Sequence, residues 1–580
     1  MKKIINNSER FEQETIEGII AAYGNRVQVL EDNWRVLVSK YPARSHKVGI
    51  VTAGGSGHLP VFLGYVGEGM LDACTVGNVF ASPSAQAMFE SIRAADRGSG
   101  VLCLYGNYGG DKLNFGMACD LAGAAGIETC QVLVTDDVAS APMSRADERR
   151  GVAGMVFAFK MAGAAAAQGA PLDEVADVAR RAVAATKTMG CALSACTVPR
   201  AGKPSFSIAD DEIEIGMGIH GEPGIETQKM MSANELADKL FAPIQDELQI
   251  KAGDECSVLV NGLGATPLEE QFIVFRRVAQ LIEECGGTIV MPQVGEYATS
   301  MEMAGVSLSI IKLDPQLKSL LLAPARTPFY TNLNLVDVLE FEAPAFRVSN
   351  DADFGTKDAS GSEGTVVKGS AASSSAVINL LRTGDIDAFA LKKRLADIAE
   401  IIGAECDYLT ELDRQNGDGD LGISMKSGFD AASKALAMDA SEDLGTLMLH
   451  ASGVFNESAP SSLGTILSIG MAGMANCLRG YAGISPKDLA HAFSCGLSSI
   501  MEKTGSKPGE KTIIDSLAPG IEALEQTGDL SAAAKAAAAG SEATKEMLAR
   551  HGRAAYYGGK SLGVLDGGSV VGRLIFEALV

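Results

Sequence analysis

The chain has 580 residues, of which 47% are hydrophobic and 21% charged, and its formal net charge at pH 7 is −23. This length exceeds a single core, so we expect two to four domains. The negative charge argues against a nucleic-acid partner, because phosphate neutralisation needs a basic face. No stretch approaches the roughly 18 apolar residues of a membrane span, and the N-terminus does not resemble a signal peptide. The eleven cysteines look unpaired and lack zinc or redox spacing, which favours a cytoplasmic protein.

From about residue 47 the chain alternates short β-rich runs with helical stretches. Strands are expected in KVGIVTAGGSGH, GVLCLYGNYGGD and ETCQVLVTDDVA, and the first two run into glycine loops. The segments between them, SAQAMFESIRAADR and LNFGMACDLAGAAG, have helical spacing. This order predicts an α/β layer with a largely parallel sheet, which binds its ligands at the carboxyl ends of the strands.

A second α/β unit is expected after a helix in EVADVARRAVAATKTMG. It contains SVLVNGLGATP, a helix in LEEQFIVFRRVAQLIEECG and a strand in TIVMPQVG. We therefore predict an α/β region over residues 1–348, with subdomains of about 1–188 and 189–348. Residues 349–374 are polar, rich in Gly and Ser and without apolar periodicity, which is typical of an interdomain linker.

The strand signals disappear in the C-terminal part of the chain, residues 375–580. Helical spacing is found in DAFALKKRLADIAEIIGAECDYLTELD, EDLGTLMLHASGVF, ISPKDLAHAFSCGLSSIMEKTG and DLSAAAKAAAAGSEATKEMLARHG. The sequence therefore predicts an α/β region of two subdomains followed by an all-α domain.

Two glycine loops that follow strands are candidates for chemistry. In AGGSGHLP three glycines allow the backbone to approach a small polar ligand, and His58 is placed beside them to move a proton. In GNYGGDKLNF, Asp111 occupies the same position on the loop after the next strand. The two residues form a candidate acid/base pair, although each loop alone is a common structural turn.

A third glycine loop, MGIHGEPGIE, carries His220, one of only six histidines. We expect this histidine to be exposed, freely oriented and neutral near pH 7. It is then able to act as a base, a metal ligand or a nucleophile. The alternative is a polar turn residue, which is the commoner role of a lone histidine.

An acidic turn, TELDRQNGDGDLGIS, gathers Asp413, Asp418 and Asp420 behind a long helix. Three carboxylates this close repel one another unless a cation neutralises them, and their hard oxygens suit Mg²⁺ with nucleotide phosphates completing its shell. A calcium loop is excluded, because leucine and serine stand where that loop requires glycine and glutamate. A solvated acidic turn is the remaining alternative.

Two apparent nucleotide-binding loops are rejected. NGLGATP has proline in place of the third glycine of a dinucleotide fingerprint. AAYYGGKS misses the phosphate-loop pattern at its alanine and lies in an all-α region with no preceding strand. If the chain binds ATP, it does so through another motif.

Taken together, the motifs resemble the dihydroxyacetone kinase family in its fused, single-chain form. GGSGH, NYGGDKLNF, ACTVPRAGKPSF, GIHGEPGIE and NGLGATPLEE are similar to the family's substrate-binding domain. ELDRQNGDGDLG, GEKTIIDSL and GRAAYYGGKSLGVLDGGS are similar to its nucleotide-binding domain. The resemblance covers nearly the whole chain in the right order, and the combination is specific although no single motif is.

The resemblance implies ATP-dependent phosphorylation of a short ketose. His220 would form a covalent hemiaminal with the ketone carbon, while His58 and Asp111 would deprotonate the terminal hydroxyl. The substrate pocket would be lined by Gly54, Gly55, Ser56, Gly57, Ser82 and Gly106. Mg²⁺ would be held by Asp413, Asp418 and Asp420 inside an α-helical barrel. The nucleotide would contact Leu421, Gly422, Ser461, Ser462, Gly464, Thr512, Arg553 and Asp566.

The resemblance also implies partners and a substrate preference. We expect a homodimer with sites shared between chains, binding a small-molecule ketose and ATP but no nucleic acid or membrane. Gly106 replaces a lysine of the family pattern, and Leu59 replaces the glutamate that usually follows the catalytic histidine. The lost lysine would leave room for an extra hydroxymethyl group, so we favour erythrulose over dihydroxyacetone. SAPSSLGTILS, at 458–468, diverges from the family's glycine-rich nucleotide turn and leaves those contacts open.

Two other functions are compatible with the resemblance. One is an FAD-AMP lyase, which forms cyclic FMN in the nucleotide domain. The other is a non-catalytic ketose-sensing regulator. The presence of both candidate histidines and of all three aspartates argues against the regulator.

Overall fold

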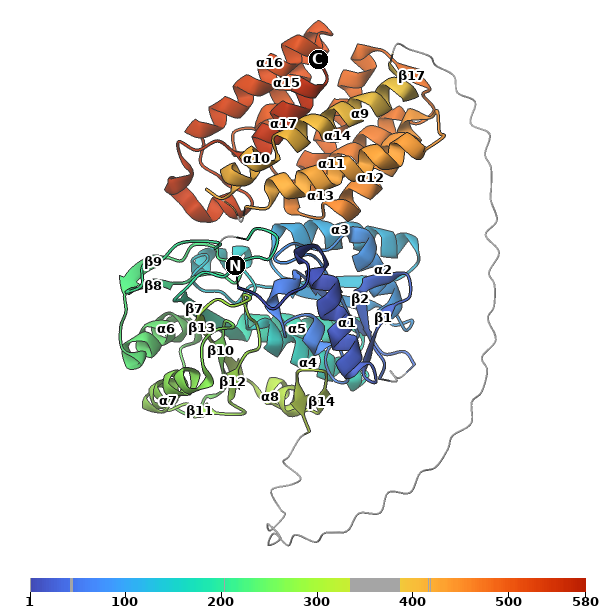
Figure 1. The fold of residues 1–580 in the computed structure, drawn as a ribbon. Helices are drawn as coiled ribbons and strands as arrows, with labels where there is room; N and C mark the ends of the chain where they lie inside the picture. The colour runs from blue at the N-terminus through green and yellow to red at the C-terminus, as the bar shows by residue number, and fades with distance from the viewer. Residues whose placement is uncertain (1, 42–44, 203, 334–385, 416, 418) are drawn as a thin grey trace.

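The computed structural model describes residues 2–41, 45–202, 204–333, 386–415, 417 and 419–580. The predicted linker at 349–374 and Asp418 lie outside these residues. In Figure 1 an α/β region, coloured blue to green, lies against a region of helices, coloured yellow to red. The predicted fold class, an α/β region followed by an all-α domain, is confirmed.

The first subdomain is built on a six-stranded sheet in the order β1-β2-β4-β3-β5-β6. β4, β3, β5 and β6 are parallel neighbours, whereas β1 and β2 pair antiparallel at one edge. Helices α2 and α3 pack on one face, and α4 and α5 on the other. β3 and β5 are buried throughout, as expected of parallel strands covered on both faces. The elements are α1 Phe11–Tyr23, β1 Val27–Leu30, β2 Asn33–Ser39, β3 Gly49–Gly54, β4 Ala73–Val76, α2 Ala85–Ala95, β5 Val101–Gly106, α3 Gly109–Ala124, β6 Thr129–Val134, α4 Met155–Ala167 and α5 Leu172–Ala185.

The second subdomain has a mixed sheet in the order β11-β10-β13-β7-β8-β9, with β12 also paired to β10. Only β11 and β12 run parallel to β10, and the other pairings are antiparallel. Helices α6 and α7 share a hydrophobic core with this sheet. The elements are β7 Thr186–Ala192, β8 Glu212–Ile215, β9 Glu226–Lys229, α6 Ala233–Leu248, β10 Glu255–Gly262, α7 Leu268–Glu284, β11 Thr288–Ile289, β12 Gln293–Gly295, β13 Gly305–Leu313, α8 Pro315–Leu322, β14 Ala325–Arg326 and β15 Thr331–Asn332.

The expected helix in EVADVARRAVAATKTMG is shorter than predicted. α5 ends at Ala185, and the following TKTMGCA is β7. The β-branched threonines and the buried Met189 pair with β13 instead of continuing the helix. The subdomain boundary at 188/189 therefore falls inside β7, and the second sheet starts a few residues earlier.

The C-terminal region consists of nine α-helices in its described part, besides short 3₁₀ turns and one small strand pair. They are α9 Ala388–Ala404, α10 Cys406–Asp413, α11 Leu421–Met438, α12 Leu444–Ser458, α13 Ser462–Leu478, α14 Pro486–Thr504, α15 Ile514–Thr527, α16 Leu530–Ala543 and α17 Gly567–Ala578. β16 Ile386–Asp387 and β17 Gly483–Ile484 form the strand pair. The long predicted helix before the acidic turn is divided into α9 and α10 near Glu405.

The two regions meet through α2 and α3 on one side and α12 and α13 on the other. The Asn114 amide donates to the Pro460 carbonyl (3.3 Å) and to Thr465 Oγ1 (3.0 Å). Asn456 donates to Asn114 Oδ1 (3.1 Å) and accepts from the Ala85 amide (3.1 Å). These contacts bring one end of the helices onto the carboxyl edge of the first sheet (Figure 1).

Cysteine usage differs from the prediction in one place. Cys477 of α13 and Cys495 of α14 form a disulfide with an S–S distance of 2.07 Å, so the expectation of unpaired thiols is wrong for this pair. The remaining cysteines are free. Among the described helices, none is long and apolar enough to cross a membrane.

Candidate active site

The carboxyl ends of β3 and β5 lie side by side, because the strands are parallel neighbours. His58 closes the 3₁₀ turn Ser56–His58 after β3, and Asp111 follows β5. Asp111 belongs to the first turn of α3 and not to a loop, which corrects the prediction in that detail. Its carboxylate is thereby placed at the positive end of the helix dipole.

His58 is fully buried. Its ring stacks on Phe80, with centroids 4.8 Å apart. Nδ1 lies 2.8 Å from the Thr299 carbonyl, which fixes the proton on Nδ1 and leaves the lone pair on Nε2. Burial and the neighbouring His220 lower the pKa of His58 to about 3, so the ring is neutral at physiological pH. Its buried Nε2 has no hydrogen-bond partner among the described residues.

Asp111 is a buried carboxyl with one oxygen held and one unpartnered. Burial raises its pKa to about 7, against the lowering effects of the Ser82 hydrogen bond and the Arg553 charge. Oδ1 has no hydrogen-bond partner within the described part of the chain. A carboxyl that titrates near neutrality and presents a bare oxygen is suited to accept a proton from a ligand.

His220 is not exposed or freely oriented, as its glycine loop had suggested. Its side chain is 8% exposed, and its Nδ1 lies 2.9 Å from Glu222 Oε1. The backbone amide of His220 donates to Glu222 Oε2 (3.0 Å), so one carboxylate holds both the ring and the loop. The imidazole stands edge-on to the rings of His58 and Tyr108, each with centroids 4.6 Å away.

Glu222 is itself buried and paired. Burial opposes its charge, but His220, Arg150 and Arg553 lower its pKa well below the usual range. Arg150 also donates from Nε to Asp137 (2.7 Å) and from Nη2 to the Gly216 carbonyl (3.0 Å). The His220 Nδ1–H therefore faces a carboxylate, which leaves Nε2 as a nucleophilic lone pair.

The glycines predicted to line the substrate pocket also have a packing role. A Cβ on Gly54 would lie 2.2 Å from the Phe62 ring, and one on Gly57 would lie 2.6 Å from the Phe80 ring. A Cβ on Gly55 would meet the Phe80 backbone at 2.7 Å. The glycines thus allow Phe80 to approach and stack on His58. Beside them, Ser56 Oγ is buried and has no partner among the described residues.

The space beside Gly106 is filled, which corrects the volume argument for a larger substrate. A Cβ on Gly106 would lie 3.0 Å from Tyr108 Cε2. The Tyr108 hydroxyl donates to the Gly151 carbonyl (3.0 Å), so the ring lies between Gly106 and His220. Leu59 packs against the hydrophobic core of the first subdomain. The open room that the sequence had suggested at Gly106 is therefore not present.

The predicted nucleotide-binding residues gather at the end of the helical region that meets the sheet. Asp413 ends α10, and Asp420 precedes α11, whose first turn contains Leu421 and Gly422. Ser461 caps α13 by accepting the Gly464 amide (3.3 Å), and Asp566 caps α17 by accepting the Ser569 amide (2.6 Å). The N-termini of α11, α13 and α17 thus carry predicted residues, and the amides of helix N-termini are suited to binding anions. Ser462 lies near Gly110 of α3 and Arg553 contacts Phe80, so both are at the end that meets the sheet, and Thr512 shortly precedes α15.

The described part of the acidic turn is folded around one carboxylate. Asp413 Oδ2 accepts the amides of Gly419 (2.8 Å) and Asp420 (3.1 Å), which folds the turn around this carboxylate. Burial raises the pKa of Asp566 to about 7, and the charges of Asp515 and Asp413 contribute to the rise. Carboxylates that crowd in this way match a divalent cation with oxygen ligands.

Comparison with known proteins decides the family. Residues 17–329 match the model of the Dak1 domain, and residues 415–580 match that of the DAK2 domain. The chain belongs to the dihydroxyacetone kinase family. Both domains occur in one chain and in the order that the motifs predicted, so this is the fused form of the family.

Full-length relatives of this dihydroxyacetone kinase family member include two erythrulose kinases. The L-erythrulose kinase of Pectobacterium atrosepticum is 35% identical, over 100% of this chain and 96% of the relative. The D-erythrulose kinase of Mycolicibacterium smegmatis is 34% identical, over 98% of this chain and 96% of the relative. The crystal structure of the dihydroxyacetone kinase from C. freundii in complex with AMP-PNP and Mg²⁺ is 26% identical. It covers 100% of this chain and 99% of its own, with a TM-score of 0.53.

Sequence reasoning missed three residues that contact the candidate histidines, Glu222, Phe80 and Tyr108. Glu222 was quoted in the GIHGEPG motif but was given no role, although its position two residues after His220 allows the contact. Gly218 was a usable signal, because a Cβ there would lie 2.1 Å from Glu222 Oε2. Phe80 and Tyr108, which enclose the two histidines, could not be identified without the fold.

Proposed function

We propose that the chain transfers the γ-phosphate of ATP to a short ketose, dihydroxyacetone or a tetrulose such as erythrulose, held as a hemiaminal on His220. The observation that carries the proposal is the pairing of His220 with Glu222, edge-on to the buried His58. A histidine held through one nitrogen by a carboxylate keeps the lone pair of the other, and the neighbouring His58 Nε2 is unpartnered among the described residues, which is an arrangement suited to a nucleophile. The kinase class agrees with the full-length relatives.

The first step is addition of His220 to the ketone. The Nε2 lone pair attacks the carbonyl carbon, the C=O π pair moves to oxygen, and that oxygen takes up a proton. Positive charge develops on the ring, and Glu222, 2.9 Å from Nδ1, stabilises it. Polyols such as glycerol lack a carbonyl and cannot form the adduct, so this step selects ketoses.

The second step is phosphoryl transfer to the terminal hydroxyl. Asp111 takes the hydroxyl proton as the oxygen attacks the phosphate, and the buried Nε2 of His58 lies in the same site to orient the substrate. Arg553 donates to the Phe80 carbonyl (3.0 Å), which places its positive charge near both groups. Asp413 and Asp420, with Asp418, would hold Mg²⁺. When bound, the ion supplies charge neutralisation for the nucleotide phosphates.

We favour a tetrulose as the substrate. The names of the full-length relatives support this choice, whereas the pocket volume does not. Tyr108 occupies the volume that the absent lysine was expected to leave. Both full-length relatives described above are named erythrulose kinases. One extra hydroxymethyl group changes selectivity by roughly 1–3 kcal/mol, so we expect overlap between substrates and not strict exclusion.

The proposal is tested with a coupled ATP assay over dihydroxyacetone, L-erythrulose, D-erythrulose and glycerol. We expect kcat/KM for one erythrulose enantiomer to be at least comparable with that for dihydroxyacetone, and no turnover of glycerol. NMR with a ketose labelled at the carbonyl carbon checks the adduct, since the ketone signal is replaced by that of a tetrahedral carbon. Absence of turnover with every ketose would overturn the kinase proposal.

The same protein sample separates the two alternative functions. A regulator would form the adduct without consuming ATP. An FAD-AMP lyase would release cyclic FMN from FAD in the absence of any ketose. Neither result is expected, because Asp111 and His58 serve a proton transfer that neither alternative needs.

A lysine at position 106 is expected to lower activity with all ketoses. Because a Cβ on Gly106 would already lie 3.0 Å from the Tyr108 ring, Gly106→Lys has to displace the ring that packs on His220. We expect kcat/KM to fall by about tenfold or more for dihydroxyacetone and erythrulose alike. Gly116→Ala, in α3 and with open space around its Cβ, is the control. A change of preference toward dihydroxyacetone without loss of activity would contradict the packing argument.

We further propose that the active form is a homodimer with sites shared between chains. The contact between the two regions, described above within one chain, would then join the helical region of one chain to the α/β region of its partner. Mixing the inactive variants His220→Ala and Asp420→Asn should restore part of the activity, because one intact site can form in each mixed dimer. Mixed dimers without activity, verified by mass spectrometry, would assign the whole site to a single chain.

A further inference from the structure

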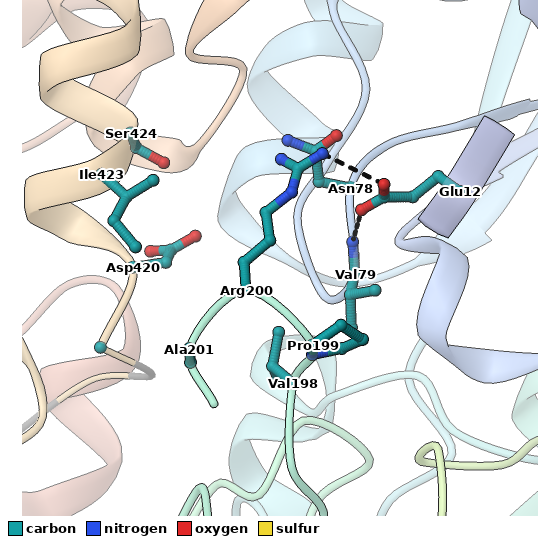
Figure 2. A pocket seen from close by; sticks show the side chains of 11 residues that line it. Glu12, Asn78, Val79, Val198, Pro199, Arg200, Ala201, Asp420, Ile423 and Ser424 are labelled. Atoms are coloured by element: carbon teal, nitrogen blue, oxygen red, sulfur yellow. Dashed lines mark hydrogen bonds and ion pairs between the residues drawn. The ribbon is translucent and has the colours of Figure 1, made fainter. Parts of the chain in front are cut away.

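A pocket opens between the two regions beside the acidic turn (Figure 2). Its α/β wall includes Arg200, Glu12 and Asn78, and its helical wall includes Asp420 and Ser424. Arg200 comes from the loop between β7 and β8, in the motif ACTVPRAGKPSF, and none of the roles assigned above involves it. The pocket therefore places an arginine opposite the residues that would hold the metal ion.

Arg200 is held at the pocket wall by a buried carboxylate. Its Nη2 donates to Glu12 Oε2 (3.1 Å), and Glu12 is 2% exposed. Its Nε is buried and makes no hydrogen bond in the described part of the chain. The nearby Glu9 carboxylate lies 3.6 Å from Nε, beyond hydrogen-bonding distance. The guanidinium is thus fixed in place at the pocket wall, and its Nε–H makes no hydrogen bond among the described residues.

The charges of the two walls are complementary to a metal-bound anion. Behind the α/β wall, Arg35 donates to Asn78 Oδ1 (2.8 Å), so a second guanidinium lies beside Arg200 and partly offsets the carboxylates of Glu12 and Glu9. The opposite wall carries Asp420. A bare anion would be repelled by Asp420, and a bare cation by Arg200. An anion that carries a divalent cation satisfies both walls.

The α/β wall of the pocket is hydrogen-bonded to the segment that packs on the candidate ketose site. Glu12 Oε1 accepts the amide of Val79 (3.2 Å), and the next residue is Phe80, which stacks on His58. Ser82, at the end of this segment, hydrogen-bonds Asp111. Glu12 therefore holds both Arg200 and the segment that packs on His58 and Asp111.

We propose that Arg200 binds the terminal phosphate of a metal–nucleoside triphosphate, as a contribution of the α/β region to nucleotide binding. This proposal rests on the proposed kinase function. Charge-assisted hydrogen bonds from a fixed guanidinium select the terminal phosphate, because the other phosphates are held by the helix N-termini of the helical region. Arg200 thereby distinguishes a triphosphate from a diphosphate.

The test measures binding of MgAMP-PNP and MgADP to the full-length protein by calorimetry. We expect Arg200→Ala to weaken MgAMP-PNP binding on the order of 10- to 100-fold while MgADP binding is unchanged within error. Arg200→Lys should give an intermediate loss, because the charge remains but the fork geometry does not. Arg97→Ala is the control, since that exposed arginine donates only to carbonyls of its own turn.

Two results would overturn the proposal. One is unchanged MgAMP-PNP binding in Arg200→Ala. The other is an equal loss for both nucleotides, which would make Arg200 a residue of the contact between the regions. The NMR signal of the ketose adduct in each variant verifies that the α/β region is intact. Wild-type turnover of a ketose tests the kinase function separately, so a failure of one proposal is distinguishable from a failure of the other.

Discussion

Replacing Asp111 with asparagine is expected to lower kcat by roughly 10²–10⁴-fold, the usual contribution of a general base. The amide keeps the volume and the Ser82 contact but cannot take the hydroxyl proton. The ketose adduct on His220 should survive, because its formation does not use Asp111. Stopped-flow or coupled assays give kcat, and NMR with the labelled ketose gives the adduct. Unchanged turnover would remove Asp111 from the mechanism.

The pH dependence of kcat in the wild type is a second test of Asp111 as the general base. Since the pKa of Asp111 is about 7 and the carboxylate is the active form, kcat should rise with pH through neutrality and then level off. Asp111→Asn should lose this rise. Asp173→Asn, an exposed aspartate in the first turn of α5, is the matched control and should keep it.

Asp111 should also make the folded protein less stable as pH rises. Its pKa is raised from 3.8 to about 7, so between these values the folded state binds more protons than the unfolded state. Stability is then lost across this window, by up to an amount on the order of 4 kcal/mol. Asp111→Asn removes that loss, and we expect the variant to melt at a higher temperature than the wild type at pH 8.

Removing the nucleophile should abolish capture of the ketose. We expect His220→Ala to show no tetrahedral-carbon signal and to lose about 100-fold or more in kcat/KM, because the ketose is then held only by hydrogen bonds. Nucleotide binding should be unaffected. His450→Ala, which removes an exposed histidine of the helical region, is the control. A ketose bound to the wild type without linkage to His220 would contradict the assignment.

A variant of Glu222 distinguishes a residue that positions His220 from the nucleophile itself. Glu222→Gln keeps the shape of the side chain but not the charge that faces the ring, so we expect the adduct to form with a lower affinity. The effect should be smaller than that of His220→Ala. An adduct as stable as that of the wild type would limit Glu222 to holding the loop.

Much of the site could be predicted because parallel strands place their carboxyl ends at one edge. His58 and Asp111 follow β3 and β5 directly, so their proximity is a consequence of the sheet. The acidic turn is a candidate metal site because carboxylates that close together need a cation, and this assignment stays a prediction. In each case the information is local in the sequence, and the fold only brings the two pieces together.

The errors concern contacts that local sequence does not contain. The glycines around His220 suggested exposure, but they allow a close approach: Gly218 leaves room for Glu222 and Arg150. Gly106 suggested an empty pocket, whereas the ring of Tyr108, two residues later, folds back over it. Threonines at the end of α5 became a strand because β13 was available to pair with them. A glycine in the sequence indicates that another group packs closely against it, but the structure is needed to identify that group.

The position of the ketose site under the helical region has a consequence for the course of a turnover. Phe80 stacks on His58 from one side and accepts the guanidinium of Arg553 from the other, so the two regions close over the reacting groups. In the proposed mechanism the ketose would bind to His220 beneath this cover. We therefore expect ordered entry, with the sugar ahead of the nucleotide. The same cover would keep bulk water, the competing acceptor, away from the phosphate during transfer.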